Sequence, residues 1–317
     1  MLRQIGDTDL NVFPLCLGCN VFGWTVDQDD AFRVLDAYLA AGGNFFDTAD
    51  VYWKFKEDNK GGESETIIGE WMRRRRCRDR MIVSTKIGAL DGLTGGLTAA
   101  NIRAKTADSM RRLGVDTIDL LYAHTDDAQT PLEETLGGFD ALVREGKVRY
   151  IAASRYDANR LGEAFEISNK NGFVRYSATQ SLYSLVERGY EGTLKSLVEK
   201  SRIGMMAYYA LGAGFLTGKY RPGVHTDSVR ANGPRPGGAR SYLDTRGIRL
   251  LATLDEISSE HGVTVAAVSL AWLMAKPTVT APIASARTVG QLDGLLPATR
   301  IALTHDDMRR LDESSAE

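Results

Sequence analysis

The feature of this sequence that most constrains its fold is a regular alternation of short apolar segments and longer amphipathic ones. The short segments are rich in Val, Ile, Leu and Phe, as buried strands are, and the longer ones repeat apolar residues with helical spacing. Strands are expected at residues 15–19, 44–46, 81–85, 117–122, 148–153, 177–181, 204–208 and 279–283. Helices are expected between them at residues 27–41, 63–75, 98–113, 132–145, 157–171, 190–200 and 263–275.

Eight strand–helix units in series, with no break in composition between them, predict an α/β fold. We expect a (β/α)8 TIM barrel, in which parallel strands close on themselves inside a ring of helices. A doubly wound open sheet is the alternative, and eight units in series make it the weaker one. Residues 2–13 alternate and turn near residues 6–9, which predicts an N-terminal β-hairpin ahead of the barrel. The 317 residues, 43% of them hydrophobic, can bury one large core, so residues 1–317 are expected to form a single domain.

The charge balance and the N-terminus narrow the classes of partner. A formal net charge of −2 gives no basic bias toward nucleic acid or an anionic membrane. The sequence has neither a signal-peptide pattern nor an apolar run long enough to span a bilayer, so we expect a soluble cytoplasmic protein. The arginine run at residues 73–76 closes a predicted helix, where positive charge suits the helix dipole, and a solvated helix end is favoured over a binding patch.

The cysteines indicate core packing rather than chemistry. Cys16, Cys19 and Cys77 are too few and too scattered for a disulfide framework. The first two have the CxxC spacing, but on a strand-like segment positions three apart point to opposite faces, so they would not readily pair or share a metal. No second Cys or Cys/His pair completes a zinc site, and all three are expected in the core.

Chemically versatile residues stand where three of the predicted strands end. Asp47 follows the second strand, Lys86 the third and His124 the fourth, and Tyr52 comes five residues after Asp47. One such junction is as well explained by an ordinary turn. Three in series indicate a site, because parallel barrels and open α/β sheets build their sites at the carboxyl ends of their strands.

These four residue types together predict a proton donor for an oxygen atom. A free tyrosine has a pKa near ~10 and is a poor acid at neutral pH, whereas a neighbouring ammonium stabilises its phenolate and lowers that pKa. A buried Lys86 needs a counter-charge, which Asp47 can supply. His124 can hydrogen-bond a carbonyl oxygen and orient it. Such a site is suited to hydride delivery to a carbonyl carbon.

At this point the sequence resembles a known family. Asp47, Tyr52, Lys86 and His124 are similar to the Asp-Tyr-Lys-His tetrad of the aldo-keto reductases, in particular of a bacterial, NADPH-dependent branch with a short C-terminal loop. The resemblance runs from about Leu2 to the last helix. It implies a barrel enzyme that reduces an aldehyde or ketone with NADPH and uses Tyr52 as the proton donor. Two alternatives stay open: a sugar or alcohol dehydrogenase running in the oxidative direction, and a cofactor-sensing regulatory subunit with little turnover.

The cofactor prediction depends on the end of the last strand. No G-x-G-x-x-G follows the first strand, so a Rossmann phosphate site is not expected. TIM barrels commonly hold phosphate after strands seven and eight, and residues 281–291 there contain small residues, an Arg and a Thr ahead of a helix. The residues alone fit an ordinary helix cap with a surface arginine as well. The resemblance implies that Ser285, Arg287 and Gln291 bind the 2′-phosphate, while Gly294 and Leu295 replace an acid and an Asn of the family pattern.

The resemblance also implies the nicotinamide and pyrophosphate contacts. Ser154 and Gln180 would bind the carboxamide and Tyr208 would stack on the nicotinamide ring. Arg155 replaces the usual Asn, so that it either weakens the carboxamide contact or turns toward the cofactor or the substrate. Residues 211–220 resemble the loop under the pyrophosphate, from which the expected contacts are Leu211, Gly214 and Lys219.

Two connections depart from the regular spacing. Residues 54–62 are charged and are expected to shape substrate entry beside Tyr52. Residues 210–244, after the seventh strand, are far longer than ordinary connections, and a lid over the cofactor is favoured over a passive insert. Trp24 and Trp53 follow the first two strands and either line the substrate pocket or pack elsewhere. The remaining aromatic and histidine predictions are core positions for Trp71 and Trp272 and surface positions for His225, His261 and His305.

Overall fold

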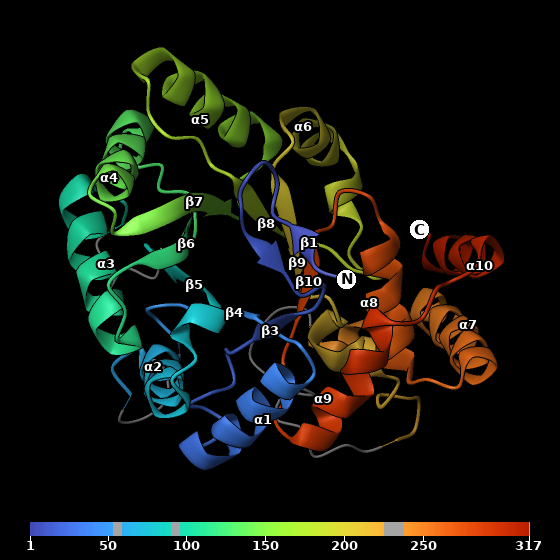
Figure 1. Cartoon of the computed structure of the whole chain (residues 1–317). Coiled ribbons are helices and arrows are strands. Elements are labelled where there is room, and N and C mark those ends of the chain that lie inside the picture. The colour runs from blue at the N-terminus through green and yellow to red at the C-terminus, as the bar shows by residue number, and fades with distance from the viewer. Residues whose placement is uncertain (53–58, 90–95, 225–237, 317) are drawn as a thin grey trace.

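Eight parallel strands form a closed barrel in the computed structural model, which describes residues 1–52, 59–89, 96–224 and 238–316. Neighbouring strands follow the chain, and the last barrel strand pairs with the first. Figure 1 shows the strands at the centre with the helices around them. The barrel strands are β3 Cys16–Gly18, β4 Phe45–Asp47, β5 Ile82–Ile87, β6 Ile118–Ala123, β7 Val148–Ser154, β8 Ala178–Leu182, β9 Gly204–Tyr208 and β10 Ala281–Ala284. The predicted (β/α)8 barrel is confirmed, and the open sheet is excluded.

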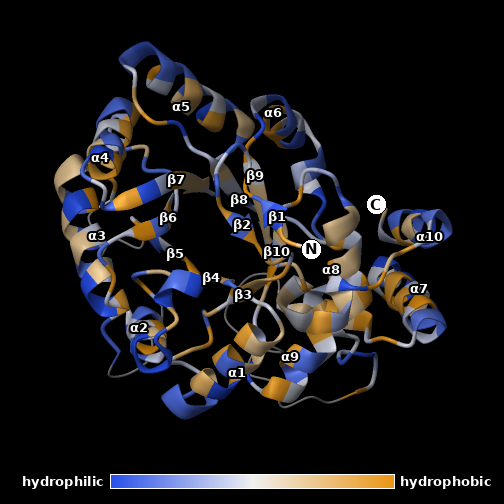
Figure 2. Ribbon diagram, viewed as in Figure 1, coloured by the Kyte–Doolittle hydropathy of each residue, from blue (hydrophilic) through white to orange (hydrophobic). Residues whose placement is uncertain are grey.

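The helices form the outer layer. They are α1 Gln28–Ala40, α2 Glu63–Arg75, α3 Ala99–Leu113, α4 Leu132–Arg144, α5 Ala158–Asn171, α6 Thr193–Ser201, α7 Thr245–His261, α8 Val265–Ala275, α9 Val289–Leu295 and α10 His305–Ser315. Short 3-10 turns are η1 Arg78–Arg80, η2 Gly189–Glu191, η3 Gly212–Thr217, η4 Ala239–Tyr242 and η5 Leu296–Thr299. In Figure 2 the outward sides of α4 and α5 are mainly hydrophilic, as expected for helices that pack one face on a barrel.

One long helix, α7, was not predicted. It begins after Asp244, whose carboxylate accepts a hydrogen bond from the backbone N–H of Gly247, and it buries Leu250, Leu254 and Ile257 at helical spacing. The Pro- and Gly-rich residues before it obscured this pattern, because they read as one continuous connection. The long connection after β9 therefore carries a helix beyond residue 244, and residues 225–237 within it lie outside the described ranges.

The predicted hairpin is present and closes the amino-terminal end of the barrel. It pairs β1 Arg3–Gln4 with β2 Asn11–Val12, and the backbone N–H of Ile5 donates to the carbonyl of Leu10 at 2.9 Å. Ile5, Leu10 and Val12 are fully buried against residues from inside the barrel. Figure 1 shows the hairpin lying across one end of the barrel, so the opposite, carboxyl-terminal end remains for a site.

Several smaller expectations are settled by burial. Trp71 and Trp272 are fully buried, and their indole N–H groups donate to Asp36 and Asp312 at 2.9 Å each. The three cysteines are free and buried.

Within the described ranges, no three His, Cys, Asp or Glu side chains gather as metal ligands would. Nor is any helix of those ranges long and apolar enough to cross a membrane.

The charged predictions were partly right. The arginine run does close α2, where Arg73 and Arg74 pair with Glu70 and Arg75 pairs with Asp36. The prediction for His261 was partly right: the residue is half-buried, and its Nε2 lies 2.9 Å from Asp307, so it joins α7 to α10. His305 is exposed, and His225 lies outside the described residues.

Candidate active site

A two-residue periodicity brings the predicted site residues together at the open end of the barrel. Every second side chain of a barrel strand points inward. The buried cluster inside the barrel contains Phe45, Tyr122, Ala152, Ala178 and Met206. Two positions further along, at the carboxyl ends of the same strands, come Asp47, His124, Ser154, Gln180 and Tyr208. The same alternation of side chains that places apolar residues inside the barrel therefore also places these polar side chains at its mouth.

Lys86 is the centre of the polar cluster and is only 1% exposed. Its ammonium Nζ donates to Oδ2 of Asp47 at 2.6 Å, to the backbone carbonyl of Thr48 at 2.7 Å and to the hydroxyl of Tyr52 at 3.1 Å. Three acceptors satisfy all three of its N–H groups, and one of them carries the compensating charge. This is the arrangement that makes a buried ammonium tolerable.

The pKa of Lys86 is raised by this arrangement. Burial by itself lowers the pKa, but the charge of Asp47 and the hydrogen bonds to Asp47 and Tyr52 outweigh it. The lysine therefore stays cationic at any physiological pH.

The pKa of Tyr52 differs from the simple expectation. Burial raises it, and the opposing attraction of Lys86 is not large enough to bring it below the ordinary value of about 10. Asp47 adds to the increase, because its negative charge disfavours a phenolate. Lys86 does lower the pKa of Tyr52, as expected, but the net shift is upward because desolvation exceeds the effect of a lysine whose charge is shared with Asp47. Tyr52 is consequently a fully protonated hydroxyl at neutral pH.

His124 stands next to Tyr52 at the end of β6. The two rings are 6.0 Å apart between centroids and nearly perpendicular, at 80°. His124 is 6% exposed, and its backbone N–H donates to the carbonyl of Ile87 at 2.8 Å. A carbonyl oxygen near the Tyr52 hydroxyl would thus lie within reach of the imidazole as well.

A second set of residues, which was not predicted, forms hydrogen bonds that hold the backbone beside Lys86. The hydroxyl of Thr48 donates to the hydroxyl of Ser64 at 2.8 Å, and Ser64 donates onward to the carbonyl of Cys19 at 2.8 Å. All three residues are buried. This series of hydrogen bonds connects the turn after β4 to the first turn of α2 and to the end of β3. It therefore fixes the position of the Thr48 carbonyl, which accepts a hydrogen bond from Lys86. No sequence pattern distinguishes such a serine from an ordinary helix-start residue.

Gln180 has a direct link to the cluster. Its side-chain N–H donates to Oδ1 of Asp47 at 2.9 Å, so both carboxylate oxygens of Asp47 are engaged. Because a carboxylate can only accept, the amide nitrogen of Gln180 must face it. The amide oxygen is then directed away from Asp47, which is the orientation that would let it accept from a carboxamide N–H group.

The residues expected at the phosphate lie at the junction of β10 and α9. Ser285 donates to the side-chain oxygen of Asn20 at 2.6 Å, across the seam between the last and first barrel strands. Gly18 makes room for it, since a Cβ there would meet the Ser285 hydroxyl at 2.8 Å. The backbone N–H of Arg287 donates to the side chain of Gln291 at 2.9 Å, and the guanidinium has no carboxylate partner among the described residues. This is a partly exposed cation that fits a phosphate.

Gly294 and Leu295 have structural contacts. The carbonyl of Gly294 accepts from the Thr264 hydroxyl, and Leu295 is 5% exposed within the outer core. Neither offers a polar side chain to a nucleotide base.

The turn after β9 is held by its own backbone. The N–H groups of Gly212 and Gly214 donate to Tyr209 and Leu211 at 2.8 Å each, so these donors are occupied. Gly214 has φ of +94°, and the ammonium of Lys219 would lie 3.7 Å from a Cβ added there. Lys219 is exposed and is therefore the group of this turn best suited to a pyrophosphate.

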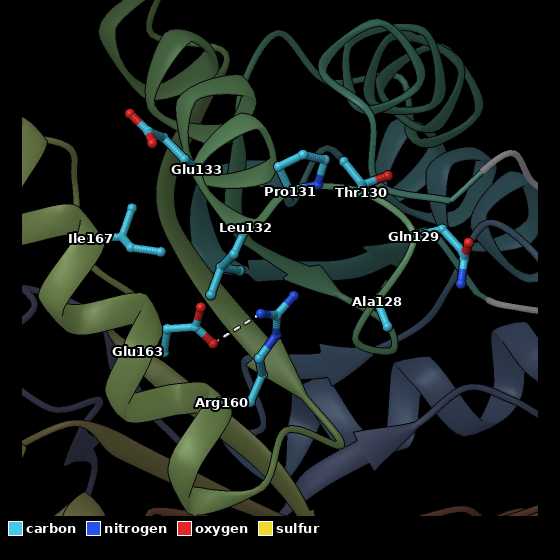
Figure 3. Close-up of a pocket in the computed structure, with 9 residues that line it drawn as sticks. All are labelled: Ala128, Gln129, Thr130, Pro131, Leu132, Glu133, Arg160, Glu163 and Ile167. Carbon is cyan, nitrogen blue, oxygen red and sulfur yellow. Dashed lines mark hydrogen bonds and ion pairs between the residues drawn. The ribbon is translucent and has the colours of Figure 1, made fainter.

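A surface pocket of about 420 Å3 lies away from these residues. Figure 3 shows it between the turn after β6 and helix α5. It is lined by Ala128, Gln129, Thr130, Pro131, Leu132, Glu133, Arg160, Glu163 and Ile167. Its arginine is already paired with Glu163 and Asp126, both at 2.9 Å. Of the predicted entrance residues, Trp24 is half-buried and Trp53 lies outside the described ranges, as does most of the loop before α2.

Comparison with known proteins gives a consistent result along the chain. The model of the Aldo/keto reductase family matches residues 14–316. Uncharacterized oxidoreductase YrpG of Bacillus subtilis (strain 168) is 33% identical over 98% of this chain and 94% of its own length. Aldo-keto reductase str7 of Strobilurus tenacellus is 33% identical over 99% and 90%. Norsolorinic acid reductase stcV of Emericella nidulans is 30% identical over 96% and 79%.

The match covers the whole barrel and includes the polar cluster at its mouth. These findings support carbonyl–alcohol chemistry with a nicotinamide dinucleotide in general terms. This chain, an oxidoreductase built on a (β/α)8 barrel, belongs to the aldo/keto reductase family.

Proposed function

We propose that the protein reduces an aldehyde or ketone to an alcohol with NADPH, and that Tyr52 donates the proton. The observation that carries the proposal is the buried ammonium of Lys86, held between Asp47 and the Tyr52 hydroxyl at 2.6 and 3.1 Å. A surface lysine would have no need of three acceptors, whereas a lysine that must stabilise a transient phenolate needs to be fixed beside it.

The protein residues divide the work around the carbonyl oxygen. The dinucleotide, when bound, supplies a hydride to the carbonyl carbon. Tyr52 gives its hydroxyl proton to the oxygen, so that one hydride and one proton complete the alcohol. Lys86 stabilises the phenolate that remains, and His124 donates a hydrogen bond that orients the carbonyl. The raised pKa of Tyr52 suits this role, because it keeps the proton on the donor until the oxygen becomes basic.

The residues proposed to bind the cofactor lie around the same barrel mouth. Ser154 and Gln180 would bind the carboxamide and Tyr208 would stack on the ring. Leu211, Gly214 and Lys219 would contact the pyrophosphate, and Ser285, Arg287 and Gln291 would contact the 2′-phosphate. We also propose a cytoplasmic location, which the three free cysteines support because disulfides are rare in reducing compartments.

Two other functions remain as alternatives. The first is a sugar or alcohol dehydrogenase that runs in the oxidative direction. A relative that is 28% identical is named aryl-alcohol dehydrogenase, of Pestalotiopsis microspora, which favours aryl substrates and leaves the direction of the reaction open. A cofactor-sensing subunit with little turnover would not require a proton donor. The complete group of Asp47, Tyr52, Lys86 and His124 at the barrel mouth supports turnover.

Purified protein should oxidise NADPH in the presence of some aldehydes or ketones, followed by loss of absorbance at the nicotinamide band. A panel of aliphatic, aryl and sugar carbonyls, with the matching alcohols and NADP+ in parallel, separates reduction from oxidation. Cofactor binding without turnover on any member of both panels would favour the regulatory alternative.

The Arg287→Ala variant should lose NADPH affinity selectively. NADPH carries a 2′-phosphate that NADH lacks, and a guanidinium can bind it through two charged hydrogen bonds. We expect NADPH binding to weaken by about 1.5–3 kcal/mol, or roughly 10- to 150-fold in Kd, with NADH nearly unchanged. Quenching of tryptophan fluorescence measures both constants.

The matched control for this variant is Arg300→Ala, which removes another exposed arginine from the same end of the chain. It should leave both dissociation constants unchanged. A wild type that prefers NADH, or equal losses for the two cofactors in Arg287→Ala, would contradict the assignment of Arg287 to the phosphate.

A further inference from the structure

Arg155 occupies an unusual position directly after β7. Its backbone has φ of +61°, in the left-handed region that arginine rarely adopts, and its N–H donates to the carbonyl of Gln180 at 3.1 Å. Residues held in such a conformation by their surroundings cluster at functional sites. The turn places the side chain at the barrel mouth, next to the end of β8, which carries Gln180.

The guanidinium of Arg155 lies over the ring of Tyr208, 5.6 Å from its centroid. Tyr208 ends β9 with its side chain on the inward-facing register, so the arginine lies above the opening of the barrel. The charge of Arg155 also reaches Tyr52, where it opposes the effect of burial on the pKa of the hydroxyl. Arg155 is therefore near both the ring at one side of the opening and the proton donor at the other.

Among the described residues, no carboxylate compensates the charge of Arg155. Its nearest arginine neighbours in the sequence are paired: Arg149 with Asp119 at 2.7 Å and Arg160 with Asp126 at 2.9 Å. Arg155 has no ion pair with any residue in the described ranges, and its side chain is exposed. A guanidinium that no carboxylate of the described residues neutralises, close to a reactive hydroxyl, is suited to receive an anion from solution.

We propose that Arg155 is a specificity-determining residue that binds a carboxylate carried by the carbonyl substrate. The inference rests on the proposed carbonyl reduction and adds the substrate class, an aldehyde or ketone with a carboxylate at some distance from the reacting carbon. The carbonyl lies at Tyr52 and His124, and the carboxylate meets the guanidinium fork above Tyr208. A planar fork suits a carboxylate, which it binds through two parallel hydrogen bonds.

A pair of substrates of the same shape tests the charge alone. 4-Carboxybenzaldehyde and 4-nitrobenzaldehyde differ in that the first carries a negative charge and the second is neutral. In Arg155→Met, kcat/KM for the carboxylate should fall by about 10- to 100-fold, the effect of losing a charged hydrogen-bond pair. The nitro compound should change by less than threefold, and Arg155→Lys should retain part of the preference.

The matched control is Arg175→Met. Arg175 is also an exposed arginine over an aromatic ring, 4.4 Å from the centroid of Phe165, but it precedes β8 at the opposite end of that strand. This variant should leave both substrates unchanged. The Kd of NADPH, measured by fluorescence quenching, should be the same in wild type, Arg155→Met and Arg175→Met.

A binding measurement makes the test independent of turnover. Calorimetric titration of the NADPH-loaded protein with 4-(hydroxymethyl)benzoate should show binding that weakens at least tenfold in Arg155→Met, while 4-nitrobenzyl alcohol binds both proteins alike. If neither aldehyde is reduced, this titration alone decides the role of Arg155, and the wider carbonyl panel decides the proposed function separately. Equal losses for the charged and neutral compounds, or a loss of NADPH affinity, would overturn the inference and assign Arg155 to the cofactor or to the fold.

Discussion

Replacing Tyr52 with phenylalanine is expected to lower kcat for carbonyl reduction by about 10²–10⁴-fold, the usual contribution of a general acid. The variant removes one oxygen atom and keeps the ring that lies 6.0 Å from that of His124. The Kd of NADPH should therefore stay close to that of the wild type. Initial rates with a carbonyl found in the panel, and fluorescence quenching by NADPH, measure the two quantities separately.

The control is Tyr150→Phe, which removes a hydroxyl from the amino-terminal half of β7, far from the mouth. The Tyr150 hydroxyl accepts a long hydrogen bond, 3.5 Å, from the backbone N–H of Asp9. Its loss should not alter kcat. If Tyr52→Phe turns over at nearly the wild-type rate, Tyr52 is not the acid, and His124 becomes the group to test.

The barrel was predictable because its signal is repeated and local. Each strand is a short apolar run, each helix shows helical spacing, and the eighth repetition excludes most other folds. The starts of helices were also predictable where the sequence has an N-cap residue, as at Asp27, Thr98 and Asp157. The side chain of each accepts a hydrogen bond from the backbone N–H three residues later. Helix α7 escaped prediction because its start follows irregular sequence with no strand before it.

The sequence predicted the positions of the candidate site residues better than it predicted their hydrogen bonds and pKa values. Strand ends that meet at one end of a barrel bring Asp47, Lys86 and His124 together whatever their contacts are. The sequence could not indicate that Gln180 would bind Asp47, or that Ser64 would help to hold the turn after β4, since both depend on side-chain directions between distant elements. Nor could it indicate that burial outweighs Lys86 in setting the pKa of Tyr52, because the two effects oppose each other.

The second large effect is expected at Lys86. The Lys86→Met variant should lose nearly all carbonyl reduction, because the phenolate formed on Tyr52 loses the cation that stabilises it. It should also lower the free energy of unfolding by about 3–5 kcal/mol, since the Asp47 carboxylate stays buried with the neutral Gln180 amide as its remaining side-chain donor among the described residues. Urea denaturation followed by circular dichroism measures the loss, and NADPH oxidation measures the activity.

A double variant separates the two roles of the pair. In Lys86→Met/Asp47→Asn the buried charge is gone, so most of the lost stability should return while the activity stays nearly absent. Asp47→Asn alone, with Lys86 left without its counter-charge, should be destabilised as well. If the double variant is as unstable as the sum of the single ones, Lys86 and Asp47 do not act as a pair.

The pH dependence of the Lys86 effect follows from the sign of its shift. The folded-state pKa is raised above the ordinary value of 10.5, so the stability that the ammonium contributes is fully present below about pH 10.5 and is lost only as pH rises further. The difference in unfolding free energy between wild type and Lys86→Met should therefore be constant from pH 7 to pH 9. Any residual activity of the variant should decline at a higher pH than that of the wild type, because Lys86 lowers the pKa of Tyr52 and its loss raises it. An unshifted pH–rate profile would show that Lys86 acts on Tyr52 by position and not by charge.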